Sequence, residues 1–263
     1  MSRLAQAFAG PRASRLVTYL TAGDPDPDRS RAALLGLARA GADVIEVGAP
    51  FSDPIADGPS IQRASERALA HHVTLTSTLE LIQSVRSDIS APLVLFTYVN
   101  PVLRLGVERF VRCAAESGVD GVLLLDLPVE EAAPVRDALA GAAIAQIFLV
   151  SPTTTDARLA DAGRLGRGFL YAISRLGVTG ARESVADSAA PLVSRIRTVT
   201  SLPVALGFGL SRPEHVREVT AFADAAVVGS AIVEVVARAA ASGSDVGAEV
   251  ERFVRWLKGA DGQ

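Results

Sequence analysis

The stretch DVIEVGAPFSDPIADGPS (43–60) begins as a short apolar strand and ends in a turn rich in proline and glycine. Near-continuous apolar runs of this kind are typical of parallel strands covered on both faces. One carboxylate, Glu46, lies inside the run, and a second, Asp57, lies in the turn. Burying an ionised carboxylate costs several kcal/mol unless something compensates it. We therefore expect the functional site of the protein at the end of this strand.

Similar apolar runs recur along the chain, separated by segments with helical spacing such as 29–40, 107–116, 130–140 and 189–198. The expected strands are 16–20, 43–47, 92–97, 121–125, 145–150, 169–173, 203–206 and 225–228. Eight strands that alternate with helices in about 250 residues predict a (β/α)8 TIM barrel. A doubly wound open sheet is the alternative.

The pattern also predicts helices outside the repeating units. Residues 245–258 place apolar side chains at helical spacing after a possible cap at Ser244 or Asp245, so we expect extra N- and C-terminal helices around the barrel. The segment SRPE (211–214) has the spacing of a capping box with proline in the first turn. No change of composition or linker divides the chain, so we expect a single domain over residues 1–263.

Composition excludes several classes of function. The net charge is −3 with acids and bases interspersed, whereas a nucleic-acid-binding domain needs clustered lysine and arginine. No apolar run approaches the length of a membrane span. The first residues lack the apolar core of a signal peptide, and a single cysteine, Cys113, cannot form an internal disulfide. We expect a soluble cytoplasmic protein.

Two residue counts limit the chemistry further. The only lysine, Lys258, fits a solvated position on the terminal helix, whereas a Schiff-base mechanism needs a lysine in a pocket. Three histidines (His71, His72 and His215) and one cysteine argue against zinc, although an oxygen-only magnesium site stays open. We expect the chain to rely on carboxylates, tyrosines and backbone groups.

Active sites of barrels form where strands end. The residues expected there are Tyr19, Glu46, Tyr98, Asp126 and Tyr171, with Asp57 just beyond. Each tyrosine has the alternative role of plugging the barrel, and Asp126 that of capping a helix near Pro128. Asp53 has the alternative role of an Asx turn before proline. Glu46 lies mid-strand and fits neither a cap nor a turn.

Glycines suggest a phosphate site. Gly207, Phe208 and Gly209 follow the seventh strand, and Gly229 and Ser230 open a helix after the eighth. Glycines let backbone N–H groups approach an anion, and loops after strands seven and eight are the usual phosphate site of such barrels. Ordinary turn glycines are the alternative. The long segment 174–190 is either a lid or a disordered surface loop.

Six motifs in this order resemble the tryptophan synthase alpha subunit family, and the resemblance covers nearly the whole chain. They are IEVGAPFSDPIADGPSIQ (45–62), TYVNP (97–101), LLLDLPVEE (123–131), SRLGVTGAR (174–182), LGFGLS (206–211) and VVGSAIV (227–233). The resemblance implies a TIM-barrel lyase that cleaves indole-3-glycerol phosphate to indole and D-glyceraldehyde 3-phosphate. It also implies that Glu46 is the general acid and base, and that Asp57 stabilises positive charge on the indole nitrogen.

The same resemblance implies further site residues and a partner. The implied substrate contacts are Tyr19, Phe96, Tyr98, Leu123, Tyr171, Thr179, Gly180, Phe208, Gly209, Gly229 and Ser230. The implied partner is a beta subunit in an α2β2 complex, contacted through Pro50, Asp53 and Pro54, to which indole is passed for tryptophan synthesis. Pyridoxal phosphate is expected only in that partner, and neither a cofactor nor a metal is expected in this subunit.

Two other functions stay open at this point. One is another phosphate-binding barrel enzyme, such as an epimerase or indole-glycerol-phosphate synthase, although the synthase needs a catalytic lysine near a strand end. The other is a barrel kept mainly to activate a beta partner. The pair Glu46 and Asp57 argues against this non-enzymatic function.

Overall fold

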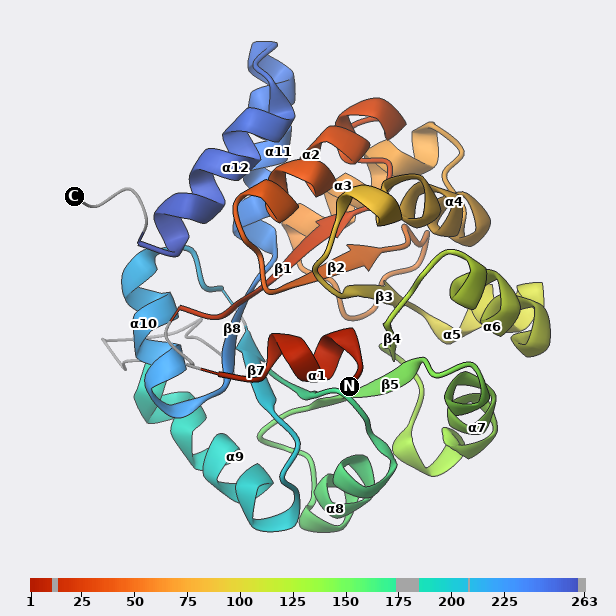
Figure 1. Ribbon diagram of the computed structural model, residues 1–263, viewed down its shortest axis with the longest axis vertical. Coiled ribbons are helices and arrows are strands. Elements are labelled where there is room, and N and C mark those ends of the chain that lie inside the picture. The colour runs from red at the N-terminus through yellow and green to blue at the C-terminus, as the bar shows by residue number, and fades with distance from the viewer. Residues whose placement is uncertain (11–13, 174–184, 208, 260–263) are drawn as a thin grey trace.

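A computed structural model of the chain describes residues 1–10, 14–173, 185–207 and 209–259. Its parallel strands pair in chain order and close into a barrel (Figure 1). The strands are β1 (Leu16–Thr21), β2 (Val44–Gly48), β3 (Leu93–Thr97), β4 (Gly121–Leu124), β5 (Ala145–Val150), β6 (Leu170–Ile173), β7 (Val204–Gly207) and β8 (Ala225–Val228). The predicted (β/α)8 barrel is confirmed, and the open-sheet alternative is wrong.

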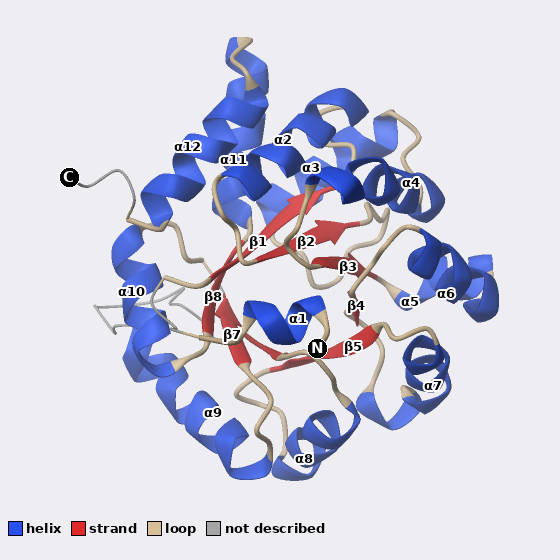
Figure 2. Cartoon of the chain, viewed as in Figure 1, coloured by secondary structure: helices blue, strands red, loops and turns tan. Residues whose placement is uncertain are grey.

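Most helices surround the strands on the outside of the barrel, and the first helix lies across one end of it (Figure 2). They are α1 (Arg3–Ala7), α2 (Pro27–Arg39), α3 (Pro59–Ala70), α4 (Leu75–Val85), α5 (Val99–Leu105), α6 (Val107–Glu116), α7 (Ala133–Gly141), α8 (Asp156–Leu165), α9 (Val185–Val199), α10 (Pro213–Phe222), α11 (Ser230–Ser242) and α12 (Val246–Leu257), with 3-10 turns η1 (Arg86–Asp88) and η2 (Val129–Glu131). The predicted helix 107–116 coincides with α6, whereas 130–140 divides into η2 and α7.

Side chains from alternate strand positions fill the interior of the barrel. An inner cluster includes Val17, Val44, Leu123 and Phe169, together with Leu4 from α1. Helix α1 lies across the amino-terminal opening (Figure 1), and Leu4 is 1 % exposed beneath it. Because strand side chains alternate, Glu46 shares the inward face of β2 with Val44. The barrel is therefore closed at one end and directs a carboxyl group inward near the other.

Helix α12 forms the predicted extra C-terminal helix. Asp245 caps it, since its Oδ1 accepts from the backbone N–H of Ala248 at 3.1 Å. A Cβ on Gly36 of α2 would lie 2.4 Å from the carbonyl oxygen of Gly247, so the two helices pack backbone against backbone. This contact buries the apolar stripe of α12 and leaves its opposite face, including Trp256, outside the core.

The predicted capping box at 211–214 is wrong. Arg212 is the N-cap of α10, no side chain caps it, and Glu214 pairs with Arg217 at 3.2 Å. Proline favours the first helical position, so Pro213 starts the helix one residue later than the S-x-x-E pattern requires. The backbone N–H of Ser211 instead donates to Nδ1 of His215 at 3.3 Å.

The solvated position predicted for Lys258 is also wrong. Its Nζ donates to the carbonyl of Gly41 at 2.6 Å and to Oδ2 of Asp43 at 2.7 Å. These contacts join the end of α12 to the start of β2, at the amino-terminal end of the barrel. The only lysine therefore lies at the opposite end of the strand from the Glu46 side of the barrel.

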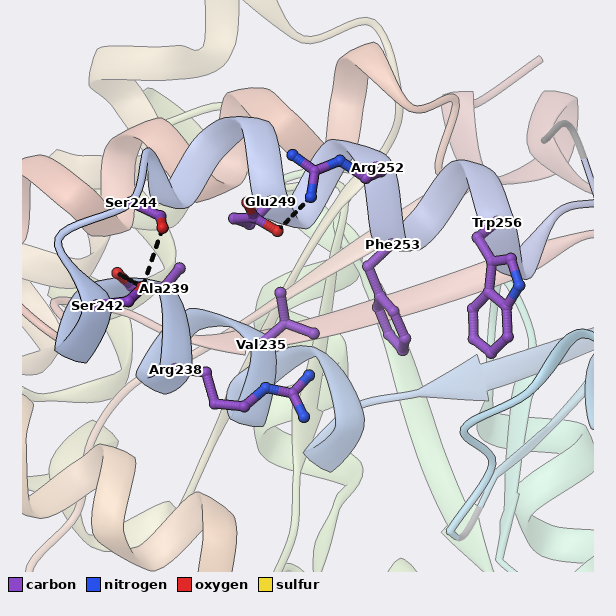
Figure 3. A pocket seen from close by; sticks show the side chains of 9 residues that line it. All are labelled: Val235, Arg238, Ala239, Ser242, Ser244, Glu249, Arg252, Phe253 and Trp256. Atoms are coloured by element: carbon purple, nitrogen blue, oxygen red, sulfur yellow. Dashed lines mark hydrogen bonds and ion pairs between the residues drawn. The ribbon is translucent and has the colours of Figure 1, made fainter.

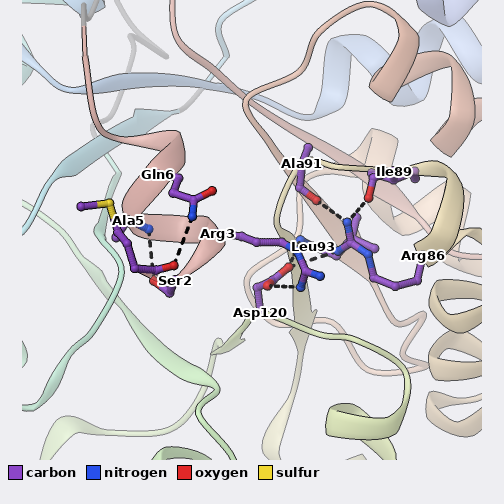
Figure 4. Close-up of polar contacts among 10 residues, drawn as sticks. Ser2, Arg3, Ala5, Gln6, Arg86, Ile89, Ala91, Leu93 and Asp120 are labelled. Carbon is purple, nitrogen blue, oxygen red and sulfur yellow. Dashed lines mark hydrogen bonds and ion pairs between the residues drawn. The ribbon is translucent and has the colours of Figure 1, made fainter.

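Asp120, just before β4, joins three parts of the closed end of the barrel (Figure 4). Its Oδ1 accepts from Arg3 Nη1 at 3.1 Å, and its Oδ2 accepts from Arg86 Nη1 at 3.1 Å and from the Leu93 backbone N–H at 2.9 Å. The Arg86 side chain is 14 % exposed and that of Asp120 is 11 % exposed. Removing the carboxylate therefore leaves a largely buried guanidinium without its counter-charge.

Replacing Asp120 with alanine should lower the free energy of unfolding by about 3 kcal/mol, because breaking a buried ion pair strands the remaining charge. Urea titration followed by circular dichroism measures this change. Arg3→Ala is the matched control, since its side chain is 52 % exposed and its loss should cost less than about 1 kcal/mol. Equal losses in the two variants would contradict the importance of the buried pair.

Candidate active site

A cavity of about 370 Å³ opens at the carboxyl ends of the strands. It is lined by seven residues expected at the site from the sequence, namely Tyr19, Asp57, Phe96, Tyr171, Gly209, Gly229 and Ser230. Its volume lies in the range of small-molecule sites, roughly 300–1,000 Å³. The barrel mouth thus brings together strand ends from β1, β3 and β6 with the loops after β2, β7 and β8.

Glu46 lies in the barrel wall beside this cavity. It pairs in register with Tyr19 of β1 and Val94 of β3, and its side chain is fully buried. Neither carboxyl oxygen has a hydrogen-bond partner among the residues that the structure describes. Burial raises the pKa of Glu46 to about 8. A carboxyl group with that pKa is able to donate a proton near neutral pH and then take one back.

This burial should make stability depend on pH through Glu46. In the folded state its pKa is about 8, whereas the ordinary value is 4.5, so the unfolded chain loses this proton first as the pH rises. Wild-type stability should therefore fall, relative to Glu46→Gln, between about pH 4.5 and pH 8, by on the order of 1 kcal/mol per pH unit. Urea unfolding of both proteins at pH 5 and pH 8 measures the difference, and a pH-independent difference would contradict it.

Two tyrosines project into the interior near Glu46. Burial raises the pKa of Tyr19 and of Tyr171 above the ordinary value, and the charge of Glu46 raises both further. A Cβ on Gly48 would lie 2.2 Å from the Tyr19 hydroxyl, and one on Gly207 would lie 3.2 Å from that of Tyr171. These strand glycines leave room for the rings, so both phenols stay neutral and line an apolar chamber.

Asp57 is held at the edge of the cavity by Tyr98. The Tyr98 hydroxyl donates to Oδ2 of Asp57 at 3.2 Å and accepts from the backbone N–H of Ala56 at 3.2 Å. The Tyr98 ring stacks on Phe51 with centroids 4.8 Å apart. Burial raises the pKa of Asp57, and the hydrogen bond from Tyr98 acts in the opposite direction. Tyr98 therefore both positions the carboxylate and favours its charged form.

The far wall of the cavity has the features of an anion site. Gly229 is the N-cap of α11 and no side chain among the described residues caps the helix, so the first N–H groups of α11 are open toward the cavity. Gly209 has a φ of +72° and also lines the cavity. Three expected contacts, Phe208, Thr179 and Gly180, lie outside the described residues.

Two other expected residues have different surroundings. Leu123 is fully buried in the inner cluster, and Leu125 lines the cavity. Asp126 does not cap a helix near Pro128, which has no side-chain cap; its Oδ1 accepts from the Val99 N–H at 2.7 Å and so holds the start of α5. The contact is between loops that follow neighbouring strands, which sequence spacing does not reveal.

The expected partner segment forms the loop between β2 and α3. Pro50 is buried, Pro54 is half-buried and Asp53 is exposed, and Ser52 Oγ donates to Oδ2 of Asp53 at 2.5 Å. In the same loop Ile55 is 84 % exposed, the largest exposure of any large apolar side chain here apart from Met1. The loop therefore presents apolar surface beside Asp57.

Sequence reasoning missed part of the cavity lining, namely Ile61, Leu125, Leu149, Ile173, Val227 and Glu234. Leu125 and Leu149 lie two positions beyond the inward-facing Leu123 and Ile147. Because side chains alternate along a strand, a residue two positions beyond an inward-facing one also faces inward, and this rule would have predicted both leucines. Glu234 is one turn into α11, where its Oε1 accepts from Ser60 Oγ at 2.8 Å.

No group of three or more histidine, cysteine, aspartate or glutamate residues suited to a metal occurs within the described part of the chain. A search of the same residues finds no helix long and apolar enough to cross a membrane.

Comparison with known proteins points to one family. The family model described as "Tryptophan synthase alpha chain" matches residues 5–261. The tryptophan synthase alpha chain of Solibacter usitatus is 46 % identical over 98 % of this chain and 96 % of its own, and that of Phenylobacterium zucineum is 48 % identical over 95 % and 90 %. The crystal structure of the alpha chain from Legionella pneumophila superposes with a TM-score of 0.86 at 32 % identity, covering 99 % of this chain and 97 % of the other. The chain therefore belongs to the tryptophan synthase alpha chain family.

Proposed function

We propose that the chain, acting as one domain over residues 1–263, cleaves indole-3-glycerol phosphate to indole and D-glyceraldehyde 3-phosphate in the cavity at the barrel mouth. The observation that carries this proposal is Glu46, a fully buried carboxyl group without a hydrogen-bond partner among the described residues. Its pKa of about 8 suits a group that must act as acid and base in one cycle.

Glu46 performs both proton transfers in this scheme. The protonated carboxyl group donates its proton to C3 of the indole ring, which leaves positive charge on the ring nitrogen. The resulting carboxylate removes the proton from the hydroxyl group on the carbon attached to C3. As that hydroxyl becomes an aldehyde, the carbon–carbon bond breaks, and its electron pair returns to the ring and neutralises the nitrogen. Glu46 ends the cycle protonated, as it began.

Asp57 stabilises the charge that develops between these two transfers. Its carboxylate, held by Tyr98, accepts a hydrogen bond from the N–H of the indole ring and faces the positive nitrogen. The surrounding apolar side chains strengthen this attraction because they exclude water. Tyr19, Phe96, Leu125 and Tyr171 form the indole pocket, whereas Leu123 belongs to the inner cluster of the barrel.

The phosphate end of the substrate binds across the cavity. The backbone N–H groups at Gly209, Gly229 and Ser230 hold the phosphate at the start of α11. Phe208 and Gly180, outside the described residues, are further proposed contacts. Thr179, which lies outside the described residues, is a further proposed substrate contact. With the phosphate bound there, the scissile bond lies between the anion site and the Glu46 carboxyl group, so binding energy orients the reacting atoms.

The proposed partner is a beta subunit in an α2β2 complex, which receives the indole and forms tryptophan. The loop with Pro50, Asp53 and Pro54 is the proposed contact, and the exposed Ile55 supports it. Pyridoxal phosphate belongs to that partner. The only lysine of this chain, which a Schiff base would require, is bound to Asp43 at the other end of the barrel. The same position of Lys258 argues against the indole-glycerol-phosphate synthase alternative.

A direct assay tests the proposal. The purified chain is incubated with indole-3-glycerol phosphate, alone and with a beta subunit, and indole and glyceraldehyde 3-phosphate are measured. We expect both products in equal amounts without the partner and faster formation with it. No cleavage under either condition, with the beta reaction nevertheless stimulated, would instead establish a barrel kept only to activate its partner.

A further inference from the structure

A second cavity lies outside the barrel, between α11 and α12 (Figure 3). Its volume is about 570 Å³, compared with about 370 Å³ for the cavity at the barrel mouth. No residue lines both cavities. A volume of this size is sufficient for a small-molecule ligand, for which roughly 300–1,000 Å³ is usual.

One wall of this groove is aromatic. The rings of Phe253 and Trp256 project from α12 with centroids 5.6 Å apart and planes inclined at 34°. Trp256 is 41 % exposed, whereas Val235 and Ala239 in the floor are buried. The buried stripe of α12 does not include Trp256, so core packing does not account for this large side chain. An exposed indole face above an apolar floor favours a flat ring as its occupant.

The opposite wall carries a positive charge, the guanidinium of Arg238. Arg238 of α11 has no hydrogen bond or ion pair with any residue that the structure describes. The other guanidinium in the groove, Arg252, is paired with Glu249 at 2.7 Å. Arginine binds planar carboxylates through two parallel hydrogen bonds. The groove is therefore complementary to a ligand with one negative charge.

The remaining polar groups determine at which end of the groove the charged group of a ligand binds. Ser242 Oγ donates to the carbonyl of Ala239 at 3.1 Å, and the Ser242 and Ser244 hydroxyls are hydrogen-bonded at 2.9 Å. With Ser242 committed as a donor, Ser244 supplies the proton between the two hydroxyls, so this end of the groove offers acceptors only. An anion therefore binds at Arg238 rather than at this end of the groove.

From these features we propose that the groove between α11 and α12 is a second ligand site that binds a small aromatic carboxylate. The carboxylate pairs with the guanidinium of Arg238, and the flat ring packs on Phe253 and Trp256. The site is separate from the proposed lyase chemistry and requires no change at Glu46 or Asp57.

The test uses the fact that Trp256 is the only tryptophan in the chain. The probe is 2-aminobenzoate, whose absorption overlaps tryptophan emission, so binding beside Trp256 produces sensitised emission from the probe. We expect this emission to saturate with probe concentration. Unlabelled benzoate should displace the probe, whereas benzyl alcohol, which lacks the charge, and cyclohexanecarboxylate, which lacks the flat ring, should compete at least roughly tenfold more weakly.

Two substitutions test whether the probe binds in this groove. Arg238→Gln should weaken probe binding by roughly tenfold or more, because the charge-assisted bonds are lost. Arg255→Gln is the matched control, since Arg255 lies on the same helix as Trp256 but pairs with Glu251 at 2.6 Å outside the groove. Both arginines are exposed, so thermal unfolding should be the same in all three proteins. Unchanged affinity in Arg238→Gln, or equal competition by benzyl alcohol, would overturn the proposal.

A second copy of the chain is the other occupant that the test detects. If Trp256 emission changes with protein concentration and analytical ultracentrifugation shows a dimer that Arg238→Gln dissociates, the groove is a self-association surface and the small-ligand proposal fails. A chain that stays monomeric while the probe saturates supports it.

Discussion

Replacing Glu46 with glutamine should lower kcat for indole release roughly 10²–10⁴-fold. Glutamine preserves the size of the side chain and occupies the same fully buried position, but its amide cannot give or take a proton near neutral pH. The substrate should still bind, because the proposed anion site at Gly229 and the aromatic walls are unchanged. Steady-state assays of indole formation should therefore show a large fall in kcat and little change in KM.

The control is Glu234→Gln, which removes a carboxylate that lines the same cavity. Its amide oxygen is still able to accept the hydrogen bond from Ser60, so kcat should change less than about tenfold. The comparison separates proton transfer from a general effect of charge in the cavity. Near wild-type turnover in Glu46→Gln, or equal losses in both variants, would rule out Glu46 as the acid and base.

The same substitution links activity to stability. Glu46→Gln should be more resistant to urea than the wild type as the pH rises toward 8, because the wild-type carboxyl group must stay protonated or carry an unpaired charge in the barrel. A variant that is inactive but more stable distinguishes a catalytic role from a folding role. The burial of Glu46 is thus a cost to the fold that its proposed function explains.

Local sequence patterns predicted the barrel well. Every strand begins and ends within one residue of its expected position, because buried parallel strands are short apolar runs bounded by turns. Glu46 was identifiable for the same reason, as the one charge inside such a run. The alternation of side chains along each strand also predicts which of them face inward, although the expected pocket included Leu123 and omitted Leu125.

Contacts between distant segments were not predictable from the sequence. Lys258 binds Asp43 across more than two hundred residues, and Ser60 donates to Glu234 from another helix. The hydrogen bond from Tyr98 to Asp57 likewise depends on how the loops after β2 and β3 meet. Such pairs arise from the closure of the barrel, and periodicity within one segment carries no information about them. The sequence indicated that Asp57 and Tyr98 lie at one mouth, but not that they touch.

Asp57→Asn should lower kcat roughly 10²–10³-fold, because it removes the negative charge that, in the proposed mechanism, faces the developing positive charge on the indole nitrogen. Asparagine retains an oxygen that accepts from Tyr98, so the loop should keep its position and KM should change little. The acid limb of the kcat profile should also disappear, since activity that depends on the Asp57 carboxylate is lost as the pH falls through its pKa. Kinetic assays across the pH range measure both effects.

Tyr98→Phe is the matched variant, since it keeps the ring stacked on Phe51 and removes only the hydroxyl group. The Tyr98 hydrogen bond favours the charged form of Asp57, so its loss should raise the pKa of that carboxyl group. The acid limb should then move to higher pH, while kcat at the optimum falls less than about tenfold. An acid limb that moves to lower pH, or one that persists unchanged in Asp57→Asn, would show that another group must be ionised for catalysis.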